Sequence, residues 1–117
     1  METETFKTWP ESAARLVAVA AGRDAADTVI KGGKWVNVHT REVLDNHDIA
    51  IANGRFAFCG PDASHCIGPD TEVIEANGAY MIPGLCDAHM HIESGMLTPA
   101  EFTRAVAPHG TTTMFTD

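Results

Sequence analysis

The spacing of hydrophobic residues predicts a helix near the start of the chain. Thr8-Trp9-Pro10-Glu11 has the form of a capping box, which would begin such a helix, and Gly22 is placed to end it in a left-handed conformation. Between them, an apolar stripe recurs at helical intervals at Ala13, Leu16, Val17 and Ala20. We expect this helix to dock on a larger structure.

From residue 27 to residue 81 the pattern changes to short β segments separated by turn residues. Gly32-Gly33, Asn53-Gly54 and Asn77-Gly78 supply the positive φ angles that tight hairpin turns need. The predicted strands span residues 28–31, 34–38, 47–52, 55–59, 72–75 and 80–82. The apolar faces that pair are expected to carry Ile49, Ile51, Phe56 and Phe58. This region should form a compact β module.

After Pro83-Gly84 the pattern predicts strand, helix and strand. A second capping box, Thr98-Pro99-Ala100-Glu101, precedes a short apolar stripe, and residues 111–116 are β-branched and aromatic. A βαβ unit implies parallel strands, and ligands in parallel sheets bind beyond the carboxyl ends of the strands. His89, His91 and Glu93 follow the first strand and Asp117 follows the second, so both strands direct polar residues to one rim.

Asp87, His89, His91 and Glu93 occupy every second position of the first strand and its continuation. In an extended chain they share one face, while Ala88, Met90 and Ile92 face the other way. Two imidazoles spaced in this way can bind one ion, and Asp87 could accept a hydrogen bond that orients an imidazole. The alternative is that two histidines share a half-exposed strand by coincidence. The residues alone leave both interpretations open.

Charge and composition exclude several classes of partner. The net charge is -8 and the pI about 5.0, without a cluster of Lys or Arg, which argues against nucleic acid. No apolar run of membrane-spanning length and no signal peptide is present, so we expect a soluble, cytoplasmic protein without a membrane partner. The three cysteines lack Cys-x-x-Cys spacing and are expected to be reduced.

At this point the residues carry a resemblance. One segment resembles the Pro-Gly-x-x-Asp-x-His-x-His signature of the amidohydrolase superfamily: Pro83-Gly84-Leu85-Cys86-Asp87-Ala88-His89-Met90-His91. Two others resemble the adenine deaminases within that superfamily: His91-Ile92-Glu93-Ser94-Gly95-Met96-Leu97-Thr98-Pro99 and His109-Gly110-Thr111-Thr112-Thr113. Cys86 and Gly95 depart from the usual residues but remove no candidate ligand.

The resemblance implies an α/β fold in which a small β-sandwich module precedes the first βαβ unit of a (β/α)8 TIM barrel. It implies metal-dependent hydrolysis of adenine to hypoxanthine and ammonia, with His89 and His91 as metal ligands and Asp117 as a further ligand. Asp87 would accept a hydrogen bond that orients a ligating imidazole without binding the metal itself. Glu93 would contact the substrate or a ligand at the rim. The expected cofactor is Mn²⁺ or Fe²⁺ in a binuclear site, with Zn²⁺ as an alternative.

The expected domains are a capping helix at residues 1–23, part of the β-sandwich at 24–82 and the start of the barrel at 83–117. A complete barrel takes roughly 250 residues, so we expect this chain to be an incomplete, inactive and aggregation-prone part of the enzyme. The complete enzyme is expected to be a homo-oligomer. Two alternatives stay open: an amidohydrolase acting on a cyclic amide or another aminopurine, and a non-catalytic β module that binds a partner or metal.

Overall fold

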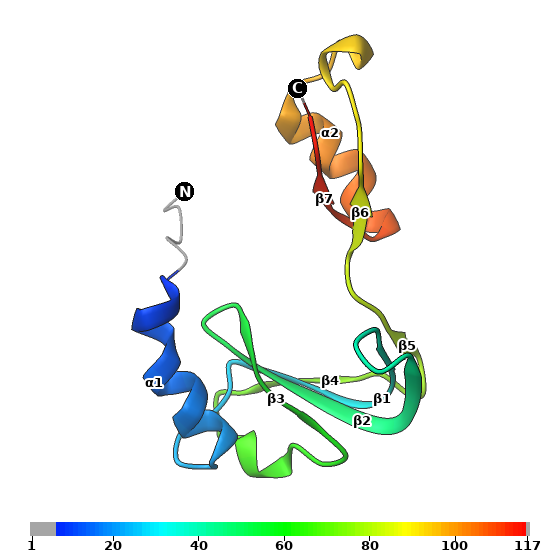
Figure 1. Cartoon of the computed structure of the whole chain (residues 1–117). Coiled ribbons are helices and arrows are strands. Elements are labelled where there is room, and N and C mark those ends of the chain that lie inside the picture. Colours follow the sequence, from blue (N-terminus) through cyan, green and yellow to red (C-terminus); the bar gives the residue numbers. More distant parts are fainter. Residues whose placement is uncertain (1–6, 117) are drawn as a thin grey trace. The chain divides into compact units, whose positions relative to one another are not determined.

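The computed structural model describes residues 7–116, and the chain divides into two compact units between Ile82 and Pro83. Over residues 7–82, the first unit contains one helix, a short 3-10 turn and a five-stranded sheet (Figure 1). Its elements are α1 (Trp9–Ala20), β1 (Thr28–Asn37), β2 (Glu42–Ala52), β3 (Arg55–Gly60), η1 (Ser64–Cys66), β4 (Glu72–Glu75) and β5 (Tyr80–Met81).

The sheet of the first unit is mixed and is built around β1. Strand β2 lies antiparallel between β1 and β3, while β4 and β5 run parallel to β1 and pair with its first and second halves. The Asn53-Gly54 pair forms the predicted turn between β2 and β3, with φ angles of 52° and 67°. The described residues of this unit form one sheet with a helix, so the second layer of a β-sandwich stays a prediction.

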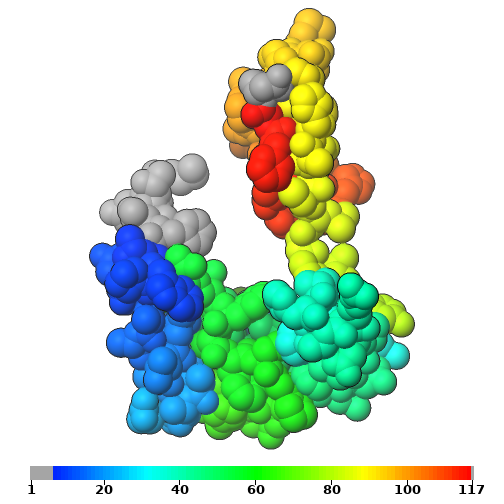
Figure 2. All heavy atoms as spheres, in the orientation of Figure 1, coloured from blue at the N-terminus to red at the C-terminus, as the bar shows by residue number. Residues whose placement is uncertain are grey.

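Helix α1 begins and ends where the capping signals predict. The Glu11 carboxylate accepts hydrogen bonds from the Thr8 N–H at 2.7 Å and the Thr8 hydroxyl at 2.6 Å, and Gly22 follows the helix with φ of 67°. Figure 2 shows this helix, in blue, packed directly against the green part of the same unit. The buried core of the unit consists of Leu16, Val19, Ala26, Val29, Ala50, Ala52, Ala63 and Cys66.

The predicted apolar stripe of α1 was wrong in one respect. Val17 is 60% exposed, whereas Val19 is fully buried together with Ser12 and Leu16. These three residues follow the spacing i, i+4 and i+7, so the buried face is rotated from the one predicted. Cys66 donates from its thiol to the Val19 carbonyl oxygen at 3.3 Å, which shows that η1 closes over this face.

The predicted hairpin turn at Gly32-Gly33 was also wrong. Both glycines lie inside the single strand β1, where the pairing with β2 becomes irregular and Gly32 has φ of 65°. The Gly32 N–H donates to the buried carboxylate of Asp48 at 2.8 Å, and its carbonyl accepts from the Gly78 N–H at 2.9 Å. The side chain of Asp48 thus provides the partner that the disturbed strand ladder does not.

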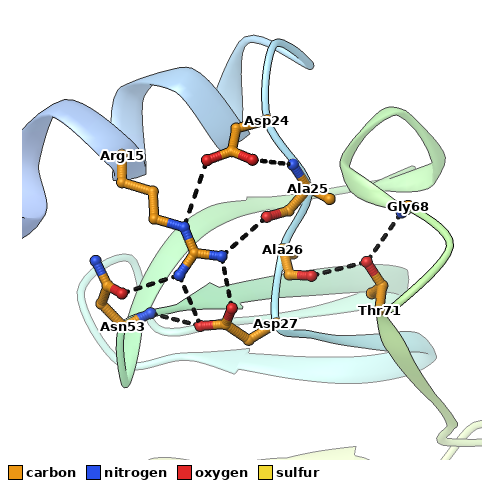
Figure 3. A network of polar contacts seen from close by, with 8 residues as sticks. All are labelled: Arg15, Asp24, Ala25, Ala26, Asp27, Asn53, Gly68 and Thr71. Atoms are coloured by element: carbon orange, nitrogen blue, oxygen red, sulfur yellow. Dashed lines mark hydrogen bonds and ion pairs between the residues drawn. The ribbon is translucent and has the colours of Figure 1, made fainter.

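A polar network joins α1 to the start of the sheet (Figure 3). The Arg15 guanidinium contacts both carboxylate oxygens of Asp27, the side chain of Asp24, the Ala25 carbonyl and the Asn53 side chain. Asp27 also accepts from the Asn53 N–H at 2.7 Å. The hydrogen bond from Arg15 is the main reason that the pKa of Asp27 lies below its ordinary value. The network therefore connects the helix, the loop after it and the β2–β3 turn.

The second unit has the predicted order of strand, helix and parallel strand. It contains β6 (Leu85–Asp87), η2 (Glu93–Gly95), α2 (Pro99–Val106), η3 (Ala107–His109) and β7 (Thr111–Met114). Thr98 accepts a hydrogen bond from the Glu101 N–H at 3.3 Å at the start of α2. The Glu101 carboxylate contacts Arg104 at 2.8 Å, so the second half of the predicted capping box is replaced by a contact within the helix. Strands β6 and β7 are parallel, as predicted.

None of the helices within residues 7–116 is both long enough and apolar enough to cross a membrane.

Candidate metal centre

The candidate site lies at the carboxyl end of β6. Strand β6 ends at Asp87, and the chain bends at Ala88. The Phe115 N–H donates to the Asp87 carbonyl at 3.0 Å, and the Met90 N–H donates to the Phe115 carbonyl at 2.9 Å. The segment with the two histidines therefore continues beside the segment that follows β7. The sequence predicted the two strands but gave no register for these backbone contacts.

Asp87 acts on the backbone of the site. Its Oδ1 accepts a hydrogen bond from the His89 N–H at 3.1 Å. The bend at Ala88 brings the N–H two residues onward to the carboxylate, as in an Asx turn, and the support of an imidazole by Asp87 stays a prediction. In this structure Asp87 fixes the direction of the chain at His89.

The imidazoles of His89 and His91 converge. Their Nε2 atoms are 2.9 Å apart, the ring centroids are separated by 4.6 Å, and the ring planes are inclined at 80°. The strand has ended before both residues, so the shared face comes from the extended course of the chain beside Phe115. The structure thus brings together the two histidines that the alternating pattern placed on one face.

Glu93 completes this group of side chains. It is the first residue of η2, and its Oε1 lies 3.1 Å from Nδ1 of His91. The side chain of His91 is 45% exposed and that of Glu93 is 65% exposed. An ion or a small molecule can therefore reach the imidazoles of this chain.

The donor set fits part of a metal site. Two Nε2 atoms that face one point can bind one divalent cation, since neutral imidazole is a good ligand for manganese, iron and zinc. Within residues 7–116, no three His, Cys, Asp or Glu side chains are arranged to hold a metal ion together. The third predicted ligand, Asp117, lies outside the described residues. The described residues therefore show two convergent imidazoles as candidate ligands.

A separate groove lies beside α2 and β7 and does not include the imidazoles. It is mostly apolar, and residues from both elements line it, among them Pro99, Thr103, Thr112 and Met114. Neither histidine of the pair nor Glu93 is among its lining residues.

Comparison with known proteins shows close relatives over the whole chain. A protein named adenine deaminase from Ruegeria pomeroyi is 74% identical over 117 residues, which are all of this chain and 19% of that protein. Another of that name, from Paracoccus denitrificans, is 65% identical over 99% of this chain and 19% of its own length. A third, from Moorella thermoacetica, is 59% identical over 87% of this chain and 17% of its own length.

Two solved structures are similar in fold. A molinate hydrolase superposes with a TM-score of 0.63 and 19% identity, covering 79% of this chain and 24% of its own. A prolidase complexed with N-methylphosphonate-L-proline superposes with a TM-score of 0.60 and 18% identity, covering 76% and 25%. At these identities the likeness concerns the fold alone.

No protein-family model matches the chain. The chain spans about a fifth of the length of the curated relatives that it matches. Over 87% to 100% of its length, it is therefore similar to a part of proteins named adenine deaminase that makes up about one fifth of those proteins.

Proposed function

We propose that the protein containing this sequence is an adenine deaminase, which hydrolyses adenine with water to hypoxanthine and ammonia. One observation carries the proposal: His89 and His91 converge within a chain that is 74% identical, from end to end, to a protein of that name. The mixed α/β fold and the parallel strands β6 and β7 support it, because polar residues beyond the carboxyl ends of parallel strands commonly bind ligands.

Four polar residues of the rim have a role in this proposal. His89 and His91 would hold a divalent cation, and Asp87 fixes the backbone at His89 through its hydrogen bond. Asp117 contributes a further ligand. When bound, such a cation would lower the pKa of its water and so make hydroxide more available near neutral pH. We propose Mn²⁺ or Fe²⁺ in a binuclear site, with Zn²⁺ as the alternative.

The wider architecture belongs to the same proposal. Strand β6, helix α2 and strand β7 would be the first βαβ unit of a (β/α)8 barrel, and residues 24–82 would belong to a β-sandwich beside it. The protein would work in the cytoplasm as a homo-oligomer with adenine as its small-molecule substrate. The parallel pairing of β6 and β7 supports the assignment of β6, α2 and β7 as a βαβ unit.

The test measures loss of adenine and formation of hypoxanthine and ammonia by the protein in its natural length, purified with manganese or iron. His89→Ala and His91→Ala should each lower the rate by roughly 100-fold or more, because each removes a ligand. His109→Ala is the matched control, since His109 ends η3 in the same unit and is not part of the pair.

Two results would contradict the proposal. If folded, metal-loaded protein left adenine unchanged, the substrate would be a cyclic amide or another aminopurine, which assays with dihydropyrimidines and related purines would identify. If the protein bound no divalent metal and converted none of these compounds, the non-catalytic alternative would replace it.

A further inference from the structure

The contact between Glu93 and His91 determines which ring nitrogen of His91 carries the proton. Oε1 of Glu93 lies 3.1 Å from Nδ1 of His91, the ring nitrogen other than the one that faces His89. An ionised carboxylate can only accept a hydrogen bond, so Nδ1 must carry the proton. In a neutral imidazole with this tautomer, the free lone pair is on Nε2. Nε2 of His91 faces Nε2 of His89 at 2.9 Å.

The backbone, rather than the Glu93 side chain, determines the position of Glu93. The Gly95 N–H donates to the Ile92 carbonyl, and the Met96 N–H donates to the Glu93 carbonyl, both at 3.0 Å. The turn η2 ends at Gly95, and Met96 after it has a φ of 53°. Because none of these contacts uses the Glu93 carboxylate, a substitution at Glu93 leaves the hydrogen bonds of the turn in place.

We propose that Glu93 is a positioning residue, which holds the His91 ring with Nδ1–H toward its carboxylate and Nε2 toward Nε2 of His89. The inference rests on the proposed function in one respect, namely that the two imidazoles bind a divalent cation. The sequence left two roles open for Glu93, contact with the substrate and contact with a metal ligand. The hydrogen bond to Nδ1 favours the second role, because it orients the imidazole of His91. Ligating histidines commonly donate their second ring N–H to a carboxylate in this way.

The test uses the protein in its natural length, stripped of metal and titrated with Co²⁺ alone. Binding is followed by the visible absorption of the cobalt ion, and the phase that His91→Ala removes is assigned to the imidazole pair. Glu93→Ala should weaken that phase by about 10- to 100-fold. Glu93→Gln should recover part of the loss, since the amide oxygen can still accept from Nδ1.

Glu101→Ala is the matched control. It also removes one carboxylate from this unit, but that carboxylate contacts Arg104 on α2 rather than an imidazole. Its Co²⁺ affinity should stay within about threefold of the unchanged protein, which is less than the loss expected for a supporting carboxylate.

Three results would overturn the inference. If Glu93→Ala bound Co²⁺ normally but raised the KM for adenine, Glu93 would contact substrate. If Glu93→Ala and Glu101→Ala weakened Co²⁺ binding equally, the effect would be one of net charge. In both cases the proposed function would stand. If His91→Ala left every cobalt phase unchanged, the metal site itself would be absent, and the proposed function would fail together with the inference.

Discussion

The carboxylate of Asp27 holds the guanidinium of Arg15 through two hydrogen bonds, one of 2.5 Å from Nη2 and one of 3.1 Å from Nη1. The same guanidinium donates to Asn53 Oδ1 at 2.9 Å and to the Ala25 carbonyl at 3.2 Å. Ala25 lies in the loop after α1, Asp27 directly precedes β1, and Asn53 lies in the β2–β3 turn. Arg15 therefore fastens the helix to the sheet by polar contacts at one end of the apolar core.

Arg15→Ala should loosen helix α1. The side chain of Arg15 is 30% exposed and that of the Asp27 carboxylate 48%, so solvent weakens the pair, and we expect a loss of about 1–2 kcal/mol. Amide hydrogen exchange in α1 and at Asn53 should then become about 5- to 30-fold faster. Arg23→Ala, at an exposed position just after the helix, is the control. Equal acceleration in both variants would contradict the role of the network.

The same pair should make the first unit sensitive to acid. The hydrogen bond from Arg15 lowers the pKa of Asp27 from its ordinary value of 3.8, so the folded protein binds a proton here less readily than the unfolded chain. The stabilisation is present above pH 3.8 and is lost as the pH falls through the lowered pKa. The thermal midpoint of Arg15→Ala should consequently fall less between pH 6 and pH 3 than that of the unchanged protein. If the thermal midpoints of the two proteins fell equally, other carboxylates would be responsible for the loss of stability in acid.

Local signals were sufficient for much of the fold. The caps of α1, the Asn53-Gly54 turn and the order of β6, α2 and β7 each depend on residues close together in sequence, and the structure confirms them. The network around Arg15 depends on partners 9 to 38 residues away, which no local pattern identifies. Gly32-Gly33 failed as a turn for a similar reason, because its partner, Asp48, is distant in the sequence.

The site could be predicted as a set of residues but not as a set of contacts. Period-two spacing placed His89, His91 and Glu93 together, and the structure shows them in contact. It could not show that Glu93 reaches Nδ1 of His91, or that Asp87 accepts from backbone, because β6 ends at Asp87 and strict alternation ends with it. Whether these residues bind metal stays a prediction.

Asp48→Ala should destabilise the first unit more than a typical surface change. The Asp48 side chain is 5% exposed, and its carboxylate accepts from the Gly32 N–H at 2.8 Å and the Ala63 N–H at 2.9 Å. Without it, two N–H groups lose their partners, which costs about 2–4 kcal/mol. Asp45→Ala is the matched control on β2, since the Asp45 side chain is 68% exposed and pairs with Lys34 at 3.3 Å. Chemical denaturation that gave the same loss for both would refute this account.

Gly84→Ala should disturb the pairing of β6 with β7. A Cβ at residue 84 would lie 2.7 Å from Cβ of Thr112 and closer still to its hydroxyl, so one segment must move. We expect a cost of about 1–3 kcal/mol and faster exchange of the Leu85 N–H, which is bonded to the Gly110 carbonyl. Gly95→Ala, where the nearest atom is 3.9 Å away, should be tolerated.

A double variant tests the cause of that disturbance. If the clash with Thr112 is responsible, Thr112→Gly should recover part of the protection lost in Gly84→Ala, and the two effects should not add. Additive losses would show instead that Gly84 is needed for its backbone conformation.

A polypeptide limited to residues 1–117 should not deaminate adenine. Its described part presents two convergent imidazoles, and no third His, Cys, Asp or Glu between residues 7 and 116 joins them in a metal site. Two ligands hold a divalent ion weakly, and water in an open site competes with both. With manganese or iron present, hypoxanthine should stay at the level of a metal-only blank, while circular dichroism confirms that the strands have formed. Conversion that His89→Ala abolished would prove the contrary, that 117 residues already contain a sufficient ligand set.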